Sequence, residues 1–218
     1  MAKWVRAYIG LGANVGDARR SLTNAVEALV ALPGATLRGV SRLYRTRPVG
    51  LTNQPDFLNA AVALDVPTGP DPGTGAVALL EALKQLERSL GRQQRQRWGP
   101  REVDLDLLVF GRHQIDARRP DGGWLRVPHP LARERLFVLA PLADLAAGLR
   151  PPGWHETVAT ARARQELAEG QDAVRTIGEF GWGRPSSTRT GRGSPGRTCQ
   201  REASCSPGER VRTPSTNQ

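Results

Sequence analysis

The chain is organised around one stretch, Arg97-Trp98-Gly99-Pro100-Arg101-Glu102-Val103-Asp104-Leu105-Asp106-Leu107-Leu108-Val109-Phe110-Gly111. Its second half predicts a β-strand, because a short run rich in Val, Leu and Phe stands between a Gly-Pro turn and a glycine. Side chains alternate on a strand, so Asp104 and Asp106 share one face while the apolar residues beside them share the other. Two neighbouring carboxylates repel each other, and one of them tends to keep its proton unless a cation joins them.

The aspartate pair therefore points to a divalent metal. Oxygen ligands on a rigid strand suit Mg²⁺, which takes one or two carboxylates and completes its shell with water and substrate phosphates. An Asp-x-Asp pair alone is weak evidence, since most such pairs lie on solvated strand faces or in turns. Guanidinium groups bind phosphate oxygens in a bidentate manner, and four stand just upstream: Arg92, Arg95, Arg97 and Arg101. Carboxylates and arginines together predict a site of nucleotide phosphoryl transfer.

The composition limits the class of protein. A chain of 218 residues suits one domain plus an extension. No run approaches the ~20 apolar residues that span a bilayer, and the first residues lack the apolar core of a signal peptide. We therefore expect a cytoplasmic protein with no membrane partner. We also expect a monomer. Both cysteines, Cys199 and Cys205, lie near the end of the chain and imply no disulfide framework.

The net charge of +10 is unevenly distributed. Residues 183–218 carry seven Arg against two Glu and consist mostly of Ser, Thr, Gly, Pro and Arg. Because so few apolar side chains cannot offset the entropy of folding, we predict one domain over residues 1–182 and a disordered basic tail over 183–218. The modest positive surplus of the domain suits an anionic substrate such as ATP, and we do not expect the domain to bind nucleic acid.

Hydrophobic periodicity predicts the other elements. Strands are expected at Val5–Leu11, Thr36–Arg45 and Phe57–Val66, helices after Asp17 and at Thr74–Leu90 and His155–Ala168, a hairpin from 114–120 and 122–127, and a short helix at Leu131–Leu136. The glycine-rich segment Gly10–Asp17 is interpreted as a tight strand-to-helix connection with Asp17 as N-cap. This order predicts an α+β fold of the ferredoxin-like split βαβ type, with a four-stranded antiparallel sheet, both helices on one face and C-terminal additions.

The run Arg97-Trp98-Gly99-Pro100-Arg101-x-x-Asp104-Leu105-Asp106 resembles the signature of the 6-hydroxymethyl-7,8-dihydropterin pyrophosphokinases of folate biosynthesis. The resemblance extends from Trp4 to about Ala168. It implies that ATP and 6-hydroxymethyl-7,8-dihydropterin are the substrates, and that pyrophosphate passes from ATP to the pterin to give the pterin diphosphate and AMP. It also implies two Mg²⁺ ions held by Asp104 and Asp106.

The resemblance implies a set of site residues as well. For ATP these are Glu87, Arg92, Trp98, Arg101, His129 and Arg135. For the pterin they are Phe57 and Phe137 as stacking walls, with Thr46, Val49, Asn59 and Trp98 around the ring edge. The catalytic group would be Arg92, Arg97, Arg101, Asp104 and Asp106, with Arg97 and Trp98 on a loop that closes over the site. The sequence identifies no general base, although a metal-coordinated Asp106 is a candidate.

Three features depart from the family pattern. Arg47 stands where a second proline is frequent, Lys84 replaces a frequent glutamine, and the loop from Arg92 to Arg97 is one residue short. From the residues alone, the charged side of the helix Thr74–Leu90, which includes Lys84 and Glu87, is interpreted as a solvated face.

Two other functions are compatible with parts of the pattern. Ferredoxin-like sheets with a basic surplus often bind single-stranded RNA, but closely spaced aromatic residues of the RNP1 type are missing from this sequence. Asp104-Leu105-Asp106 also resembles the metal motif of nucleotide-sugar transferases, for which the chain is short. Without the family resemblance, Phe57 and Phe137 would be assigned to the core and His129 to either role.

Overall fold

The computed structural model describes residues 3–48, 52–93, 99–170 and 172–182. The predictions for Val49, Arg95, Arg97, Trp98 and the tail after residue 182 lie outside the described residues. The strands are β1 (Trp4–Ala13), β2 (Thr36–Val40), β3 (Leu43–Thr46), β4 (Phe57–Pro67), β5 (Asp104–Phe110), β6 (Ile115–Arg118), β7 (Trp124–Val127) and β8 (Val174–Gly178). The helices are α1 (Ala18–Val30), α2 (Pro72–Ser89), α3 (Leu136–Ala146) and α4 (Val158–Glu169), with a 3₁₀ turn at Ala132–Glu134.

The main sheet is antiparallel and six-stranded, in the order β5-β1-β4-β3-β8, with β2 also paired to β4. The prediction of an α+β fold with an antiparallel sheet is confirmed, but the prediction of four strands is wrong. The expected strand Thr36–Arg45 divides into β2 and β3 at Ser41, whose hydroxyl accepts the backbone N–H of Ala61 at 2.8 Å. The sixth strand, β8, was not predicted.

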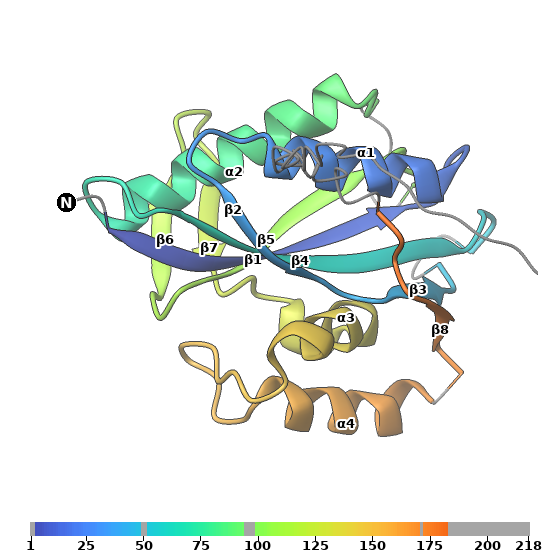
Figure 1. Cartoon of the computed structure of the whole chain (residues 1–218). Helices are drawn as coiled ribbons and strands as arrows, with labels where there is room; N and C mark the ends of the chain where they lie inside the picture. The colour runs from blue at the N-terminus through green and yellow to red at the C-terminus, as the bar shows by residue number, and fades with distance from the viewer. Residues whose placement is uncertain (1–2, 49–51, 94–98, 171, 183–218) are drawn as a thin grey trace, which may run out of the picture. The chain divides into compact units, whose positions relative to one another are not determined.

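Helices α1 and α2 cover one face of the sheet (Figure 1). The predicted N-cap is confirmed, because the Asp17 side chain accepts the backbone N–H of Arg20 at 3.0 Å. The apolar stripe of α1 is fully buried in the main core, through Leu22, Ala25, Val26 and Leu29. Helix α2 begins slightly earlier than expected, where Asp71 caps Thr74.

The two predicted helices, α1 and α2, share one face as expected, and the opposite face carries α3 and α4, which come after β5 as C-terminal additions (Figure 1). The expected short helix Leu131–Leu136 is reduced to the 3₁₀ turn, and the apolar run after it forms α3 despite Pro141 within it. Leu139 and Leu142 of α3 pack with Tyr8 and Leu108 of the sheet in a second core cluster. Burial of these side chains outweighs the hydrogen bond that a proline removes from a helix.

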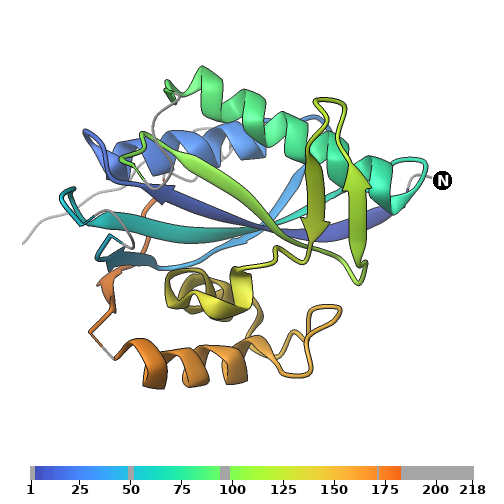
Figure 2. The same ribbon diagram turned by 180° about the vertical axis from the view of Figure 1, so that it is seen from behind.

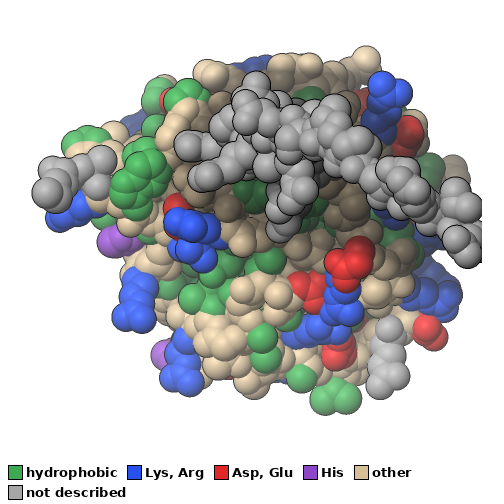
Figure 3. Space-filling model, in the orientation of Figure 1, with side chains coloured by type: hydrophobic (Ala, Val, Ile, Leu, Met, Phe, Trp, Pro, Cys, Tyr) green, Lys and Arg blue, Asp and Glu red, His purple; other side chains and the backbone are tan. Residues whose placement is uncertain are grey.

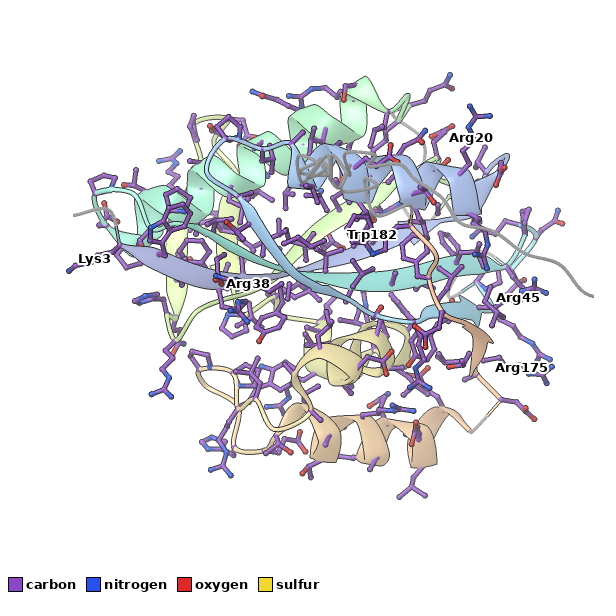
Figure 4. The ribbon with its side chains drawn as sticks, in the orientation of Figure 1. Lys3, Arg20, Arg38, Arg45, Arg175 and Trp182 are labelled. Atoms are coloured by element: carbon purple, nitrogen blue, oxygen red, sulfur yellow. The ribbon has the colours of Figure 1, made fainter. Side chains whose placement is uncertain are left out.

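The remaining segments extend this framework. Strands β6 and β7 form the predicted hairpin as a separate two-stranded sheet, seen from behind in Figure 2. Strand β8 pairs with β3, after which Phe180 is buried in the main core and Trp182 packs against it (Figure 4). Within the described residues, no helix combines the length and apolar character needed to cross a membrane.

Candidate active site

The aspartates of β5 point away from the core, as the alternation predicts. Val103, Leu105 and Leu107 are at most 2% exposed and belong to the core beneath α1 and α2. Asp104 and Asp106 face the opposite side of the sheet, where they line a cleft. Residues of α3, which lies on this face of the sheet, also line the cleft.

The cleft has a volume of about 330 Å³ and brings together most of the expected site residues. Ten of them line it: Thr46, Phe57, Asn59, Arg92, Arg101, Asp104, Asp106, His129, Arg135 and Phe137. Gly10 and Gly12 of β1 form part of its lining. The stretch Gly10–Asp17 was interpreted as a loop, but β1 continues to Ala13, so these two glycines lie on the strand itself.

Three cations surround Asp104. Arg92 Nη1 lies 2.8 Å from Asp104 Oδ1, and Arg101 forms an ion pair with the second carboxylate oxygen. Lys84 Nζ lies 3.9 Å from one oxygen of Asp104 and 3.9 Å from one oxygen of Asp106. The arginines expected to bind phosphate and the aspartates expected to hold metal therefore share one end of the cleft.

The two aspartates differ in acidity. Burial raises the pKa of Asp104, but the positive charges of Arg101, Lys84 and Arg92 together outweigh burial and hold the pKa below its ordinary value. Although Asp106 is partly open to solvent, desolvation by the cleft walls and then the negative charge of Asp104 raise the pKa of Asp106. The expectation that one carboxyl keeps its proton more readily is confirmed, and that carboxyl is Asp106.

Glu87 lies beneath the charged end of the cleft instead of lining it. The residue is 2% exposed, accepts the backbone N–H of Leu105 and the Lys84 ammonium at 2.7 Å each, and forms an ion pair with Arg92. The interpretation of this residue as part of a solvated helix face is wrong, and its expected contact with ATP would act through Lys84 and Arg92. A buried carboxylate in such a position fixes the cations that approach the cleft.

His129 lines the cleft, and one hydrogen bond defines the tautomer of its neutral ring. The backbone N–H of Leu131 donates to its Nδ1 at 3.3 Å, so the proton of the neutral ring is on Nε2. Burial lowers the pKa of His129 and outweighs the attraction of Asp106. A neutral imidazole of this tautomer can donate one hydrogen bond to an oxygen in the cleft.

The other end of the cleft is built from β3, β4 and α3. Thr46 and Phe57 pair across β3 and β4, and Asn59 Nδ2 donates to Thr46 Oγ1 at 2.8 Å. A Cβ at Gly12, the neighbour of Asn59 on β1, would lie 3.1 Å from the Asn59 amide oxygen. Because position 12 is a glycine, no side chain crowds the buried amide of Asn59. Phe137, near the start of α3, lines the same end.

Asn14 connects segments on both sides of the cleft, and the sequence did not single it out. Its Nδ2 donates to Gln54 Oε1 and to the Pro55 carbonyl, both at 3.0 Å, while its Oδ1 accepts the backbone N–H of Arg101 at 2.8 Å. Its own backbone N–H donates to the Arg101 carbonyl at 3.0 Å. The side chain is 4% exposed. It therefore fixes the approach to β4 and the approach to β5 at once.

We expect Asn14→Ala to reduce the free energy of unfolding by about 1–3 kcal/mol, because polar groups of Arg101 and Pro55 lose their partners. Chemical denaturation would measure the change. Asn24→Ala, an exposed position on α1, is the matched control and should be nearly neutral. An Asn14→Ala variant as stable as wild type would show that the two segments hold their positions without this side chain.

The sequence did not identify several other cleft residues, and the reason differs from one to the next. Lys84 was assigned to a solvated face because helical periodicity does not reveal that α2 runs above the β5 aspartates. Arg47 was noted only as a departure from the family, yet it lines the cleft. A signal for Gly10 and Gly12 did exist, since glycines that alternate within a strand mark places where a ligand or another chain comes close.

The chain is similar in sequence to known proteins of one family. Residues 8–147 match the family model of 7,8-dihydro-6-hydroxymethylpterin-pyrophosphokinase. The chain is 45% identical over 159 residues to a 2-amino-4-hydroxy-6-hydroxymethyldihydropteridine pyrophosphokinase of Methylorubrum extorquens, covering 73% of this chain and 92% of the relative. It is also 45% identical over 139 residues to the Bacillus subtilis protein of the same name, covering 64% of this chain and 77% of that protein.

Solved structures show the same fold at low sequence identity. A crystal structure of an HPPK-DHPS in complex with substrates aligns with a TM-score of 0.64 and 11% identity, over 81% of this chain and 47% of that chain. The wild-type HPPK-DHPS of Plasmodium falciparum aligns with a TM-score of 0.64 and 13% identity, over 81% and 48%. The chain thus spans about half the length of these longer proteins. The family match and the bacterial relatives show that the chain belongs to the 7,8-dihydro-6-hydroxymethylpterin-pyrophosphokinase family.

Proposed function

We propose that the protein transfers the terminal pyrophosphoryl group of ATP to the hydroxymethyl oxygen of 6-hydroxymethyl-7,8-dihydropterin in folate biosynthesis. One observation carries this proposal: a single cleft joins an end with carboxylates and arginines to an end with two phenylalanines and a buried amide. The first end suits a triphosphate and the second a flat heteroaromatic ring. A cleft that holds both substrates can bring the hydroxyl oxygen to the phosphorus.

The reaction forms one bond and breaks one. The hydroxyl oxygen attacks the β-phosphorus of ATP, and the bond from that phosphorus to the oxygen bridging the α-phosphate breaks. AMP leaves with the electron pair of that bond, and the hydroxyl proton passes to water. Arg92 and Arg101, already fixed by Asp104, would hold phosphate oxygens in line with the attacking group. His129, with its proton on Nε2, would add a further donor.

Asp104 and Asp106 would hold the two Mg²⁺ ions. Their donor set fits, because two carboxylates lie at alternate positions on one strand face. Within the described ranges, no group of three or more His, Cys, Asp or Glu side chains is placed to hold a metal. Water and phosphate oxygens would then complete each shell, which is the arrangement Mg²⁺ prefers. Bound Mg²⁺ would neutralise the charge that develops on the phosphate oxygens.

The pterin would lie between Phe57 and Phe137, with Asn59 and Thr46 at its edge. Offset stacking favours two aromatic walls around a flat ring, and a positioned amide fixes the orientation of the ring. The hydrogen bond from Asn59 to Thr46 preorganises this edge before the ligand arrives. The Arg135 guanidinium lies 5.5 Å from the centre of the Phe137 ring, and Arg135 lines the same cleft.

We expect Phe137→Ala to weaken pterin binding more than ATP binding. The substitution removes one stacking wall, which contributes roughly 0.5–1.5 kcal/mol beyond the area that it buries. Isothermal titration with each ligand would measure both affinities. Equal weakening of the two ligands in a folded variant would assign Phe137 to the core instead. Leu145→Ala, also on α3 but outside the cleft, controls for damage to the helix.

The RNA-binding alternative receives little support from the surface. On the face seen in Figure 3, Lys and Arg side chains are scattered and interleaved with Asp and Glu, and do not form one stripe. Figure 4 shows Lys3, Arg38 and Arg45 at well-separated points. An RNA groove normally combines a continuous basic track with stacked aromatics.

The decisive experiment measures AMP release from ATP with and without 6-hydroxymethyl-7,8-dihydropterin. We expect AMP to appear only when the pterin and Mg²⁺ are both present. A parallel thermal-shift series compares a non-hydrolysable ATP analogue plus Mg²⁺ and pterin with an oligonucleotide and with a nucleotide sugar. Stabilisation by the oligonucleotide or the nucleotide sugar alone, without pterin-dependent AMP release, would replace the proposal with that alternative.

A further inference from the structure

Lys84 is fixed at the centre of the charged end of the cleft. Its Nζ donates a hydrogen bond to Glu87 Oε1 at 2.7 Å and another to the Leu105 carbonyl at 2.9 Å. The same nitrogen lies 3.9 Å from both Asp104 and Asp106. An ammonium group has three N–H donors, so two hold it in place while its charge acts on both aspartates.

The charges here are balanced without any metal. Among the described residues, three carboxylates form ion pairs with three cations: Glu87, Asp104 and Asp106 with Lys84, Arg92 and Arg101. A free divalent cation therefore meets aspartates that already have positively charged neighbours. A polyphosphate, in contrast, brings several negative charges of its own.

Lys84 differs from Arg92 and Arg101 in the carboxylates that it approaches. Within the part of the chain that the structure describes, it is the one Lys or Arg side chain within 4.0 Å of Asp106. The arginines pair with Asp104 and lie beside the carboxylates, whereas the ammonium lies near both proposed metal ligands. Its repulsion of a cation bound to both ligands is consequently large.

We propose that Lys84 is a positioning residue that weakens the binding of a free divalent cation to Asp104 and Asp106, so that metal is retained only together with a polyphosphate. This inference rests on the proposed metal role of the two aspartates. With no nucleotide in the cleft, the ammonium supplies part of the positive charge that the aspartates require. Bound polyphosphate offsets that charge and lets the metal stay. When only a nucleoside monophosphate remains, the repulsion prevails again and favours release of the metal.

A purely structural role for Lys84 would be visible in other measurements. Its hydrogen bond to the Leu105 carbonyl joins α2 to β5, and its hydrogen bond to Glu87 lies within α2, so loss of the side chain should lower stability in any case. Loss of a structural tether would leave the affinity for free metal unchanged or reduce it. Loss of a repelling charge would raise that affinity, and the sign of the change separates the two roles.

The test measures Mn²⁺ binding, as a stand-in for Mg²⁺, from the electron paramagnetic resonance signal of the unbound ion in the full chain without nucleotide. We expect Lys84→Gln and Lys84→Met to bind Mn²⁺ about tenfold more tightly than wild type. Arg88→Gln, which removes an exposed cation one turn further along α2, should not change the affinity. With a non-hydrolysable ATP analogue present, the difference between wild type and Lys84→Gln should shrink.

Unchanged or weaker Mn²⁺ binding in both Lys84 variants would overturn the inference, and so would an equal gain in Arg88→Gln. Asp106→Asn distinguishes failure of the inference from failure of the metal site. If Asp106→Asn binds Mn²⁺ with the ATP analogue as well as wild type does, the proposed metal site is wrong. If Asp106→Asn loses that binding while the Lys84 variants gain none, only the role of Lys84 is wrong.

Discussion

Asp106→Asn is expected to lower turnover about a hundredfold or more while the protein without metal becomes as stable as wild type or more stable. Loss of one preorganised charged group at a phosphoryl-transfer site raises the barrier by about 3 kcal/mol, which corresponds to this factor. The stability gain follows from the raised pKa of Asp106, since asparagine keeps the volume and removes an unfavourable charge. Release of AMP measures the first effect, and thermal unfolding without metal measures the second.

The stability gain should depend on pH. Because the pKa of Asp106 is raised on folding, the folded state holds its proton more tightly than the unfolded state does. The stability contributed by the protonated carboxyl is present at low pH and is lost as pH rises through the folded pKa. The advantage of Asp106→Asn over wild type should therefore be absent in acid and appear above the ordinary carboxyl range. Denaturation curves at a series of pH values would test this.

Asp104→Asn provides the contrast. Its turnover should fall similarly, but its stability should decrease, because Arg92, Arg101 and Lys84 lose the carboxylate that they surround. The lowered pKa of Asp104 means that its contribution is present at neutral pH and is lost only as pH falls through the folded pKa. Normal turnover in either folded variant would place phosphoryl transfer elsewhere.

Arg101→Lys is expected to reduce turnover about tenfold or more, although the charge is retained. A lysine cannot reproduce the planar pair of donors with which a guanidinium binds a carboxylate or a phosphate. The backbone at this position stays anchored, because Asn14 binds its N–H and carbonyl. The loss should consequently appear in kcat with little change in folding.

Steady-state kinetics with saturating pterin would measure this effect. Arg88→Lys, the same exchange at an exposed position of α2, should keep wild-type values. Wild-type kinetics in Arg101→Lys would reduce Arg101 to a structural or solvated residue.

The strands and helices whose buried apolar side chains recur at a regular spacing were predictable from the sequence. Alternation along Asp104–Phe110 identified both the strand and the face that carries the carboxylates, because a strand with one buried side permits a single register. Asp17 and the apolar stripe after it identified the start of α1 and its buried side. In each case a local pattern and the tertiary environment favour the same conformation.

Other parts depend on contacts between distant segments. The strand expected at Thr36–Arg45 breaks because Ser41 bonds to Ala61 on β4, and the sequence of either segment alone gives no sign of that pairing. Strand β8 is short and becomes recognisable only beside β3. Helix α3 contains Pro141, so its apolar run gives no regular helical signal, and it forms a helix through burial against the sheet.

In the site, too, some features follow from local sequence and others from contacts between distant segments. The carboxylates and upstream arginines follow from residue type and spacing, and the structure places those that it describes together. The positions of Lys84 and Glu87 relative to them depend on how α2 crosses β5, which no local pattern encodes. The roles of individual residues toward ATP and pterin came from the family resemblance and stay predictions.

Pairing of β8 with β3 has a consequence for self-association. Without β8, the strand that carries Thr46 would end the sheet and offer unpaired backbone groups to a second molecule. Instead the outermost position falls to β8, a short strand that carries Arg175 and ends at Gly178, where φ is 110°. A charged side chain and a glycine with positive φ disfavour pairing with a strand of another molecule. The proposed pterin end of the cleft is thus kept one strand away from the border at which sheet proteins begin to aggregate.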